Sequence, residues 1–587
     1  MTDPVPPRPP AAAGMRLSPD VQLRVADGGR LLIGGYPGRL VRLTPAGAAL
    51  VARWRAGEPV GLDRADRPGG ADRPGSADRP GGPDRPDGAD RADAAGPAER
   101  SGPALARRLL DAGMVHPVWD PIGPAGPADP VHPVHPPDPA STADLVSTAD
   151  TPDPVDTADP ADTAEPADTA DLADRSARRI PGDPVDQADR VDAARPGTAS
   201  PRSAGDVRDV TVVVPTLDRT RELDRCLRAV RAGAPHAPVL VVDDGSADGR
   251  AVETVANAHS ATALRHRTRR GASAARNTGL AAVGTPFVAF VDSDVVVPPD
   301  WVRALRPYLD DPVVAAVAPR VVAHEPGKGW LAAYETVHSP LDMGPHAGSI
   351  RPGSPVPYVP TATLLVRVAA VGRPFDEDLP IGEDVDLEWR LVEAGWTVRH
   401  VPEVTVAHEH RDRLWAFVAR RRLYARSIGL LDARHPGALP AARLSPPLAA
   451  AWLLLAARRP VVSAVAAAVG VGLLARALRG SADHPVRLAT RLVGAALPAT
   501  GEGLARAVER VWWPPLALAA VPVATLQAPV ALAVAVPPVL DWLRAGRRPP
   551  LHRHLAARAL HDLVSTAGTW EGCVRERTVR PLLPTLR

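Results

Sequence analysis

The chain of 587 residues is long enough for roughly three or four domains of about 150 residues each. Its 69 Lys and Arg almost balance its 67 Asp and Glu, which disfavours a generally basic nucleic-acid-binding protein. Two cysteines, Cys226 and Cys573, are too few for a disulfide framework or a cysteine-rich zinc or iron–sulfur site.

The N-terminal sequence predicts a small folded module over 15–119. Residues 1–14 lack the basic start and long apolar run of an export signal, which favours a cytoplasmic origin. Alternating apolar residues around Asp27-Gly28-Gly29 predict a β-hairpin, and Thr44-Pro45 is typical of a helix N-cap followed by proline. With a second short helix expected at Ala104–Asp111, the pattern suggests a winged-helix-like module.

Low-complexity sequence interrupts and follows this module. The chain holds 69 prolines and 48 glycines, a composition that predicts disorder in part of it. Asp-Arg-Pro recurs every six residues from position 66, and an acidic residue occurs at every third position from Asp150 to Asp174. Such sequence fits extended, solvated chain, so 120–205 is predicted to be an acidic linker, with an acidic interaction tail as the alternative.

Residues 207–430 carry the pattern of an α/β domain. Short apolar runs rich in β-branched residues alternate with stretches suited to helices, and the runs are Val210–Val214, Val239–Val242, Phe287–Val291 and Val313–Val317. This alternation predicts a mostly parallel sheet with helices on its faces.

Polar residues follow the first two of these strands. Pro215 and Thr216 end the first, and Asp243 and Asp244 end the second, at the edge where open α/β sheets bind ligands. An aspartate there can accept hydrogen bonds from a base or from ribose hydroxyls, although an Asx-turn that caps the next helix is an alternative. The sequence has no glycine-rich dinucleotide fingerprint and no P-loop, which disfavours a dehydrogenase and excludes a P-loop enzyme.

Two further segments indicate phosphate and metal chemistry. The small residues of Gly271–Gly279 allow a helix to lie close to the sheet or to a ligand, and Arg276 within it is a planar cation suited to phosphate. Asp292 and Asp294 follow the strand Phe287–Val291 and point the same way, which suits a divalent cation that also takes phosphate oxygens. A solvated arginine and a polar strand end are the alternatives.

Asp384 and His408 complete the candidate site. Asp384 lies in the first turn of a helix predicted after Gly382, where the helix dipole stabilises its anion and where a carboxylate can accept a proton from a hydroxyl. His408 follows an apolar, strand-like stretch, and it either completes the metal site or has a structural role.

Residues 440–587 are predicted to form a helical, apolar region that associates with a membrane. Val511–Leu540 has no charged residue, and its thirty residues exceed the roughly 20 that span a bilayer, although its six prolines argue against a straight helix. One interpretation is a kinked or re-entrant segment associated with the cytoplasmic side of the cell membrane. A buried, alanine-rich helical hairpin of a soluble domain is the other.

Five motifs occur in the order and spacing of the family 2 glycosyltransferases, which the chain therefore resembles over about 207–415. They are Pro215-Thr216, Asp243-Asp244-Gly245-Ser246, Ala275-Arg276-Asn277, Asp292-Ser293-Asp294 and Glu383-Asp384. The resemblance implies a GT-A fold, Mg2+ or Mn2+ as cofactor, and inverting transfer of a sugar from a nucleotide donor.

The resemblance also implies a role for each candidate residue. The nucleotide-sugar contacts would be Pro215, Thr216, Asp243, Asp244, Arg276 and Asp292. Asp292 and Asp294 would be the Asp-x-Asp pair, with Asp294 as the direct metal ligand, and Asp384 would be the catalytic base. The Gln-x-x-Arg-Trp motif of processive polysaccharide synthases is missing from the sequence.

A narrower resemblance concerns the whole chain. The N-terminal module is similar to PqqD-type peptide-recognition domains, and together with Ser339–Pro345 and the apolar C-terminal region it resembles the mycofactocin-system glycosyltransferases. That resemblance implies transfer of glucose, from UDP-glucose, to a small peptide-derived redox cofactor. The insert within the module departs from this family.

Two alternatives remain at this point. The acceptor is a polyprenyl phosphate or a cell-envelope glycan if the apolar C-terminal region serves to reach lipid-linked substrates. A protein of another class, a non-catalytic membrane-bound adaptor that binds a peptide, would show no transfer from any nucleotide sugar.

Overall fold

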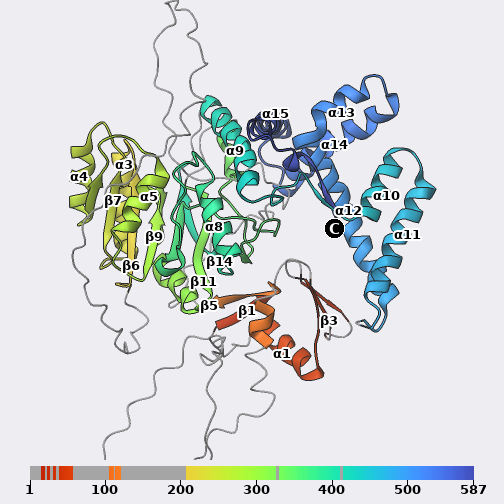
Figure 1. Cartoon of the computed structure of the whole chain (residues 1–587), viewed down its shortest axis with the longest axis horizontal. Coiled ribbons are helices and arrows are strands. Elements are labelled where there is room, and N and C mark those ends of the chain that lie inside the picture. Colours follow the sequence, from red (N-terminus) through yellow and green to blue (C-terminus); the bar gives the residue numbers. More distant parts are fainter. Residues whose placement is uncertain are drawn as a thin grey trace, which may run out of the picture. The chain divides into compact units, whose positions relative to one another are not determined.

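The computed structural model describes most of the chain outside the low-complexity segments (Figure 1). The described residues are 15–19, 23–26, 29, 31–34, 39–56, 105–110, 113–119, 207–324, 329–409, 414–480 and 482–586. The predicted acidic linker and the Asp-Arg-Pro repeats lie outside the described residues, so both interpretations stay predictions.

The N-terminal module is built from short antiparallel strands. β2 (Arg24–Ala26), β3 (Leu31–Gly34) and β4 (Arg39–Arg42) form one sheet, and β1 (Met15–Pro19) pairs with β5 (Val115–Trp119). The pairing of β2 with β3 confirms the predicted hairpin.

Helix α1 (Pro45–Arg55) begins where the sequence predicts. The Thr44 hydroxyl accepts a hydrogen bond from the Gly47 N–H at 3.1 Å, which satisfies one of the free donors at the helix start. Residues 105–110 are helical as well. Buried apolar residues from both sides of the insert form one cluster, which contains Leu17, Leu32, Leu43, Val51, Trp54, Ala106, Leu109, Leu110, Met114 and Val115. The description of this module as winged-helix-like stays a prediction.

The central domain contains a nine-stranded sheet in the order β10-β14-β11-β13-β9-β6-β7-β8, with β12 paired to β14. Its strands are β6 (Val210–Thr216), β7 (Val239–Asp243), β8 (Thr262–Arg265), β9 (Phe287–Val291), β10 (Val295–Val296), β11 (Val314–Ala323), β12 (Gly348–Ser349), β13 (Thr363–Arg367) and β14 (Thr397–His408). Four of them confirm the predicted apolar strands.

The sheet is mixed, which corrects the expectation of a mostly parallel sheet. β6 pairs in parallel with β7 and β9, but β13 runs antiparallel between β9 and β11. The first residue of β13, Thr363, pairs with the last residue of β9, Val291. β13 therefore begins where β9 ends and runs in the opposite direction. The Asp292 N–H donates to the Ala362 carbonyl at 3.0 Å, and the segment before β13 therefore lies beside the candidate site.

Helices cover both faces of this sheet, as the sequence predicts (Figure 1). The alternation of β6 decides which side chain meets which face, because Val212 and Val214 belong to one buried cluster and Val213 to the other. The helices of the domain are α3 (Thr220–Gly233), α4 (Gly249–Ala258), α5 (Ala272–Ala281), α6 (Trp301–Leu305), η3 (Arg306–Asp310), α7 (Trp330–Val337), η4 (Val368–Ala370), α8 (Glu383–Glu393) and α9 (Leu414–Arg434).

The C-terminal region is helical. It consists of α10 (Pro446–Ala456), α11 (Pro460–Ala477), α12 (Pro485–Ala507), the π-helical turn η5 (Val508–Trp512), α13 (Trp513–Ala520), α14 (Ala524–Arg544), α15 (Leu551–Arg575) and η6 (Arg580–Leu582). The short strands β15 (Arg443–Leu444) and β16 (Thr585–Leu586) pair in parallel and hold its two ends together.

Helix α9 of the central domain packs along helix α15 of the C-terminal region (Figure 1). A Cβ on Gly429 would lie 2.4 Å from the Gly572 carbonyl oxygen, and a Cβ on Gly568 would lie 2.6 Å from the Arg422 carbonyl oxygen. The glycines therefore allow the two backbones to approach closely.

Two helices of the described region are long and apolar enough to cross a membrane by length and composition, namely α11 and α14. Their apolar windows are only 17% and 11% buried, respectively. The charge-free segment predicted from the sequence forms α13 and α14, and the chain bends between them at Val521–Val523.

Candidate active site

The polar residues at the ends of β6, β7 and β9 lie along one edge of the sheet. β6 lies between β7 and β9 and is parallel to both, so the three carboxyl ends meet there. In the register, Thr216 is the partner of Asp243. The Thr216 hydroxyl oxygen is buried and has no hydrogen-bond partner among the described residues, which leaves it able to bind a polar ligand atom.

Asp244 holds the loop that leads into α5. Its two carboxylate oxygens accept hydrogen bonds from the N–H groups of Arg270 and Gly271 at 2.9 and 2.7 Å. The Nδ1 atom of His266 lies 2.7 Å from the same carboxylate. Asp244 is only 4% exposed, and these bonds order both the loop before α5 and the end of β7.

Both carboxylate oxygens of Asp243 accept hydrogen bonds from residues that follow β7. It accepts a hydrogen bond from the Ser246 N–H at 2.8 Å and one from the Arg265 guanidinium at 3.0 Å. The bond to Ser246 spans three residues rather than the two of an Asx-turn, and the following helix α4 is capped by Asp248, whose carboxylate accepts a hydrogen bond from the Ala251 N–H. The donor contacts expected of Asp243 and Asp244 stay predictions.

Helix α5 lies close against β6, as its small residues suggest. A Cβ on Gly279 would lie 2.3 Å from a methyl group of Val213, so a larger residue there would push the helix away. This close approach directs the Arg276 side chain of α5 toward the end of β9.

The structure places Arg276 differently from the expectation that it faces phosphate. Its side chain is fully buried, with Nη2 2.8 Å from Asp292 and Nη1 2.8 Å from Glu383. Coulombic attraction from these two carboxylates outweighs the effect of burial and raises the pKa of Arg276. Arg276 therefore joins the end of β9 to the start of α8. Its buried guanidinium does not face the surface, where a nucleotide sugar would bind.

Asp294 lies beside His408, as a metal site built from these two residues requires. The pairing of Val295 with His408 brings β10 and β14 together, and the His408 Nε2 atom lies 3.3 Å from Asp294. Arg219 lies 2.5 Å from the other carboxylate oxygen of Asp294. Burial alone would raise the pKa of Asp294, but the neighbouring His408 and Arg219 lower it below its ordinary value.

The donor atoms around Asp294 fit a divalent cation that keeps open positions. A carboxylate and an imidazole are both suitable ligands for Mn2+, and Mg2+ is often held by one or two carboxylates with substrate phosphates. Asp292 is turned toward Arg276, and no group of three or more His, Cys, Asp or Glu side chains within the described ranges could hold a metal ion. Any bound cation would therefore take further ligands from substrate and water.

Asp384 is fully buried at the start of α8. Gly382 precedes it with φ 92° and ψ 10°, a left-handed conformation that favours glycine. The carboxyl accepts a hydrogen bond from the Val385 N–H at 2.8 Å and a long one from the Thr361 N–H at 3.5 Å. Burial, followed by the negative charge of Glu383, raises the pKa of Asp384 to about 8.

Glu388 lies one helical turn beyond Asp384 and was not identified from the sequence. It is fully buried, and one of its oxygens accepts a hydrogen bond from the Val359 N–H at 2.9 Å. The other oxygen has no hydrogen-bond partner in the described parts of the chain. Burial and the charge of Asp384 raise the pKa of Glu388 well above its ordinary value. The spacing of four residues from Asp384 was the available signal.

The chain thus connects the predicted site residues through two elements. Asp244 fixes the start of α5, and Arg276 of the same helix binds Asp292 and Glu383. The segment before β13 contacts both the end of β9 and the carboxyl of Asp384. Residues far apart in the sequence are therefore joined at one end of the sheet.

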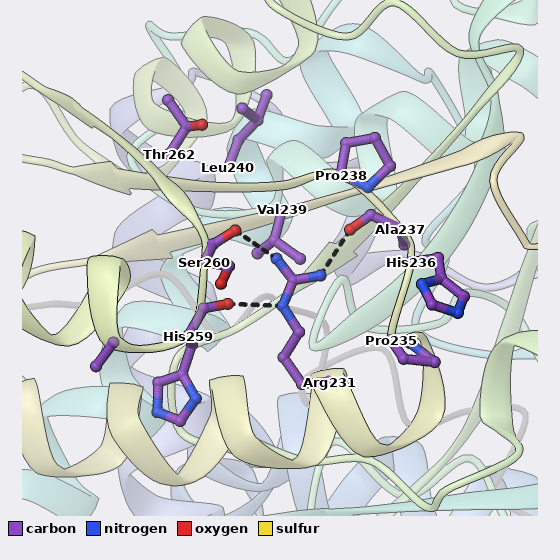
Figure 2. A pocket seen from close by; sticks show the side chains of 11 residues that line it. Arg231, Pro235, His236, Ala237, Pro238, Val239, Leu240, His259, Ser260 and Thr262 are labelled. Atoms are coloured by element: carbon purple, nitrogen blue, oxygen red, sulfur yellow. Dashed lines mark hydrogen bonds between the residues drawn. The ribbon is translucent and has the colours of Figure 1, made fainter.

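Figure 2 shows a pocket at the opposite end of β7, near its first residue Val239. Arg231 is the cation of this pocket, and its guanidinium donates to the carbonyl oxygens of Ala237, His259 and Ser260, each at 2.7 Å. Because the three carbonyl oxygens already bind this guanidinium, the pocket offers no cation to the phosphates of a nucleotide and is not a candidate site for a nucleotide sugar.

Comparison with known proteins identifies the catalytic class. The family model described as "Glycosyl transferase family 2" matches residues 211–369. The chain is 38% identical over 405 residues to the "Pre-mycofactocin glycosyltransferase" of Mycobacterium tuberculosis, which covers 66% of this chain and 84% of the relative. It is 28% identical over 213 residues to "Glycosyltransferase AglE" of Haloferax volcanii, covering 34% of this chain and 67% of that protein.

Among solved structures, the mannosyltransferase PcManGT from Pyrobaculum calidifontis, in complex with GDP-Man and Mn2+, is 19% identical with a TM-score of 0.36. The match covers 62% of this chain and 87% of that one.

The central domain with its mixed sheet has a GT-A-like glycosyltransferase fold, and the C-terminal part is helical. The chain is an enzyme, which removes the alternative of a non-catalytic adaptor. From its motifs and from these relatives, the chain belongs to glycosyltransferase family 2 and resembles the pre-mycofactocin glycosyltransferase.

Proposed function

We propose that this glycosyltransferase uses a divalent cation to transfer glucose from UDP-glucose, with inversion, to a small peptide-derived precursor of a redox cofactor. The name of the Mycobacterium tuberculosis relative supports the acceptor. The observation that carries the mechanism is the buried Asp384 carboxyl, whose raised pKa makes it a strong base at the start of α8.

The donor would lie along the carboxyl edge of the sheet. The buried hydroxyl of Thr216, together with Pro215 and Asp244, would contact the nucleoside, and Asp243 would shape the loop beside it. Asp294 and His408 would hold Mg2+ or Mn2+ next to the diphosphate. The cation supplies positive charge that stabilises the leaving nucleoside diphosphate.

Arg276 would act as a positioning residue. It fixes the Asp292 carboxylate on one side and Glu383 on the other, so it sets the distance between the metal-binding segment and the start of α8. In place of the diphosphate contact expected from the sequence, its role would be to keep the two halves of the site in register.

Asp384 would take the proton of the acceptor hydroxyl as that oxygen attacks the anomeric carbon. The oxygen–carbon bond forms on the face opposite the departing diphosphate, which gives inversion. Because the carboxyl must be ionised to accept a proton, turnover is expected to rise with pH through about 8.

The experiment is a donor and product analysis with the purified full-length chain and Mn2+. Nucleotide release is followed with a panel of UDP- and GDP-sugars, with and without a peptide-derived acceptor, and the anomeric configuration of the product is read by NMR. UDP-glucose is expected to be used with inversion. Retention of configuration, or acceptor-stimulated release from another donor only, would contradict the proposal.

A second acceptor class is favoured by the poorly buried apolar helices α11 and α14. Membrane association on the cytoplasmic side would let the same site glycosylate a polyprenyl phosphate or an envelope glycan. Radiolabelled sugar that partitions into the organic phase would favour this acceptor, whereas label in a water-soluble product favours the peptide-derived one. For the peptide-derived acceptor, the N-terminal module is proposed to bind the peptide part.

A further inference from the structure

Helices α13 and α14 form a hairpin whose tip is apolar and exposed. Leu518, Val521 and Val523 at this tip are 75%, 77% and 42% exposed. Further along α14, Leu532 and Val536 are 62% and 42% exposed. A contiguous apolar surface of this kind is unfavourable in water and marks a site of interaction with protein or membrane.

The length of the uncovered part excludes a simple transmembrane span. Pro537 and Pro538 are buried, and Asp541 binds Arg506 at 2.6 Å and Arg558 at 3.3 Å, so the end of α14 is held by protein. The uncovered stretch 524–536 is about 20 Å long at 1.5 Å per residue, shorter than the roughly 30 Å of bilayer hydrocarbon.

The length of α13, the other helix of the hairpin, limits how deeply the tip can enter a bilayer. α13 has eight residues, and at the same rise it extends about 12 Å from its first residue to the tip. This length is less than the roughly 15 Å of hydrocarbon in one leaflet.

The charges flanking the hairpin match an anionic lipid surface. No charged residue occurs in Val511–Leu540, whereas Arg547, Arg548 and Arg553 follow closely and are exposed. Basic residues beside an apolar insertion attract the anionic headgroups of a cytoplasmic leaflet. The α10–α11 hairpin differs, because its tip carries the exposed Arg458 and Arg459.

We propose that the α13–α14 hairpin inserts its tip into one leaflet of an anionic bilayer and returns to the same side, so that the enzyme is monotopic. This inference deepens the membrane association proposed above and names its anchor. No residue of the hairpin belongs to the candidate active site described above, so the proposed lipid contact does not depend on which sugar or acceptor is used.

Flotation with vesicles tests the anchor in the full-length chain. Val521→Asp places a charge at the tip, and it is expected to weaken binding to phosphatidylcholine–phosphatidylglycerol vesicles by roughly tenfold or more, because hydrocarbon strongly disfavours a carboxylate. Val574→Asp is the matched control, since Val574 on α15 is 72% exposed and lies outside the hairpin. The control is expected to float like the natural protein.

Unchanged flotation of Val521→Asp overturns the proposal, and so does failure of the natural protein to float. Arg547→Glu with Arg548→Glu is expected to reduce binding only where the vesicles contain phosphatidylglycerol. Nucleotide release is measured in the same samples, and it should be equal in Val521→Asp and in the control. If flotation behaves as expected while no donor is turned over, the proposed function fails and the anchor stands.

A single cysteine at the tip tests the topology. Cys226 and Cys573 are buried, so Val521→Cys provides the accessible thiol for an environment-sensitive fluorophore. Binding to vesicles is expected to shift its emission to the blue, and spin-labelled lipids in the facing leaflet should quench it. Modification of the unlabelled thiol by an impermeant reagent enclosed in the vesicle lumen would show a span and overturn a monotopic insertion.

Discussion

Replacing Asp384 by asparagine is expected to abolish turnover and, at the same time, to make the protein more stable. The substitution keeps the shape of the side chain but removes a carboxyl that is fully buried beside Glu383. As the proposed base, it cannot be replaced by an amide, and loss of a general base costs roughly 100- to 10,000-fold in rate. Donor binding should persist, because the nucleoside and metal contacts are on other segments.

The gain in stability follows from the raised pKa of Asp384. The ordinary pKa of this carboxyl, which applies to the unfolded chain, is 3.8, and its pKa in the folded protein is about 8. Between these values the folded chain holds a proton that the unfolded chain has released, so stability falls by about 1.4 kcal/mol for each rise of one pH unit. At pH 7 the loss is about 4 kcal/mol, and asparagine removes it. The long Thr361 N–H bond is lost at a cost of about 1 kcal/mol, which leaves a net gain of about 3 kcal/mol.

Denaturant unfolding at several pH values measures this effect. The difference between Asp384→Asn and the natural protein should be small near pH 5, grow up to about pH 8 and then level off. Asp386→Asn is the control on the same helix. Hydrogen bonds from His435 and Arg390 outweigh burial and lower the pKa of Asp386, so its replacement should destabilise the protein at neutral pH. A stability difference for Asp384→Asn that is independent of pH, or retained turnover, would refute the reasoning.

Four other substitutions, with one control, test the rest of the site. Asp294→Asn and His408→Ala are each expected to raise the Mn2+ concentration for half-maximal nucleotide release by roughly tenfold or more, and unchanged metal titrations would contradict the metal site. Arg276→Met leaves two buried carboxylates without their cation, so it should lower the free energy of unfolding by about 3–5 kcal/mol, as measured by denaturation. Gly279→Ala should cost about 1–3 kcal/mol because its Cβ would lie 2.3 Å from a valine methyl of β6. Gly284→Ala should be nearly neutral, because a Cβ there would meet no atom of the described residues within 4 Å apart from its chain neighbours.

The residues at the strand ends are the part of the site that can be predicted from local sequence. An apolar run followed by Asp-Ser-Asp or Asp-Asp is visible in the sequence, and the parallel pairing of β6 with β7 and β9 is enough to bring those ends to one edge. The helix at Glu383–Glu393 and its glycine start are equally local features.

The orientation of a side chain around a helix depends on what surrounds that helix. In the sequence of α8, Val385 and Trp389 are four residues apart, which indicates one buried side, yet the acidic residues Glu383, Asp384 and Glu388 are all buried too. The antiparallel strand β13 is the cause, since the segment before it covers this part of α8 and donates N–H groups to Asp384 and Glu388. No local pattern in α8 could reveal a strand that arrives from elsewhere.

The sequence by itself determined the catalytic class, the candidate acids and the apolar character of the C-terminal region, because motifs, periodicity and composition are properties of neighbouring residues. The tertiary structure alone decided that Arg276 bridges Asp292 and Glu383, that burial raises the pKa of Asp384, and that the apolar segment bends into a hairpin. Those outcomes depend on desolvation and on charges from distant segments, and both exist only once the chain has folded.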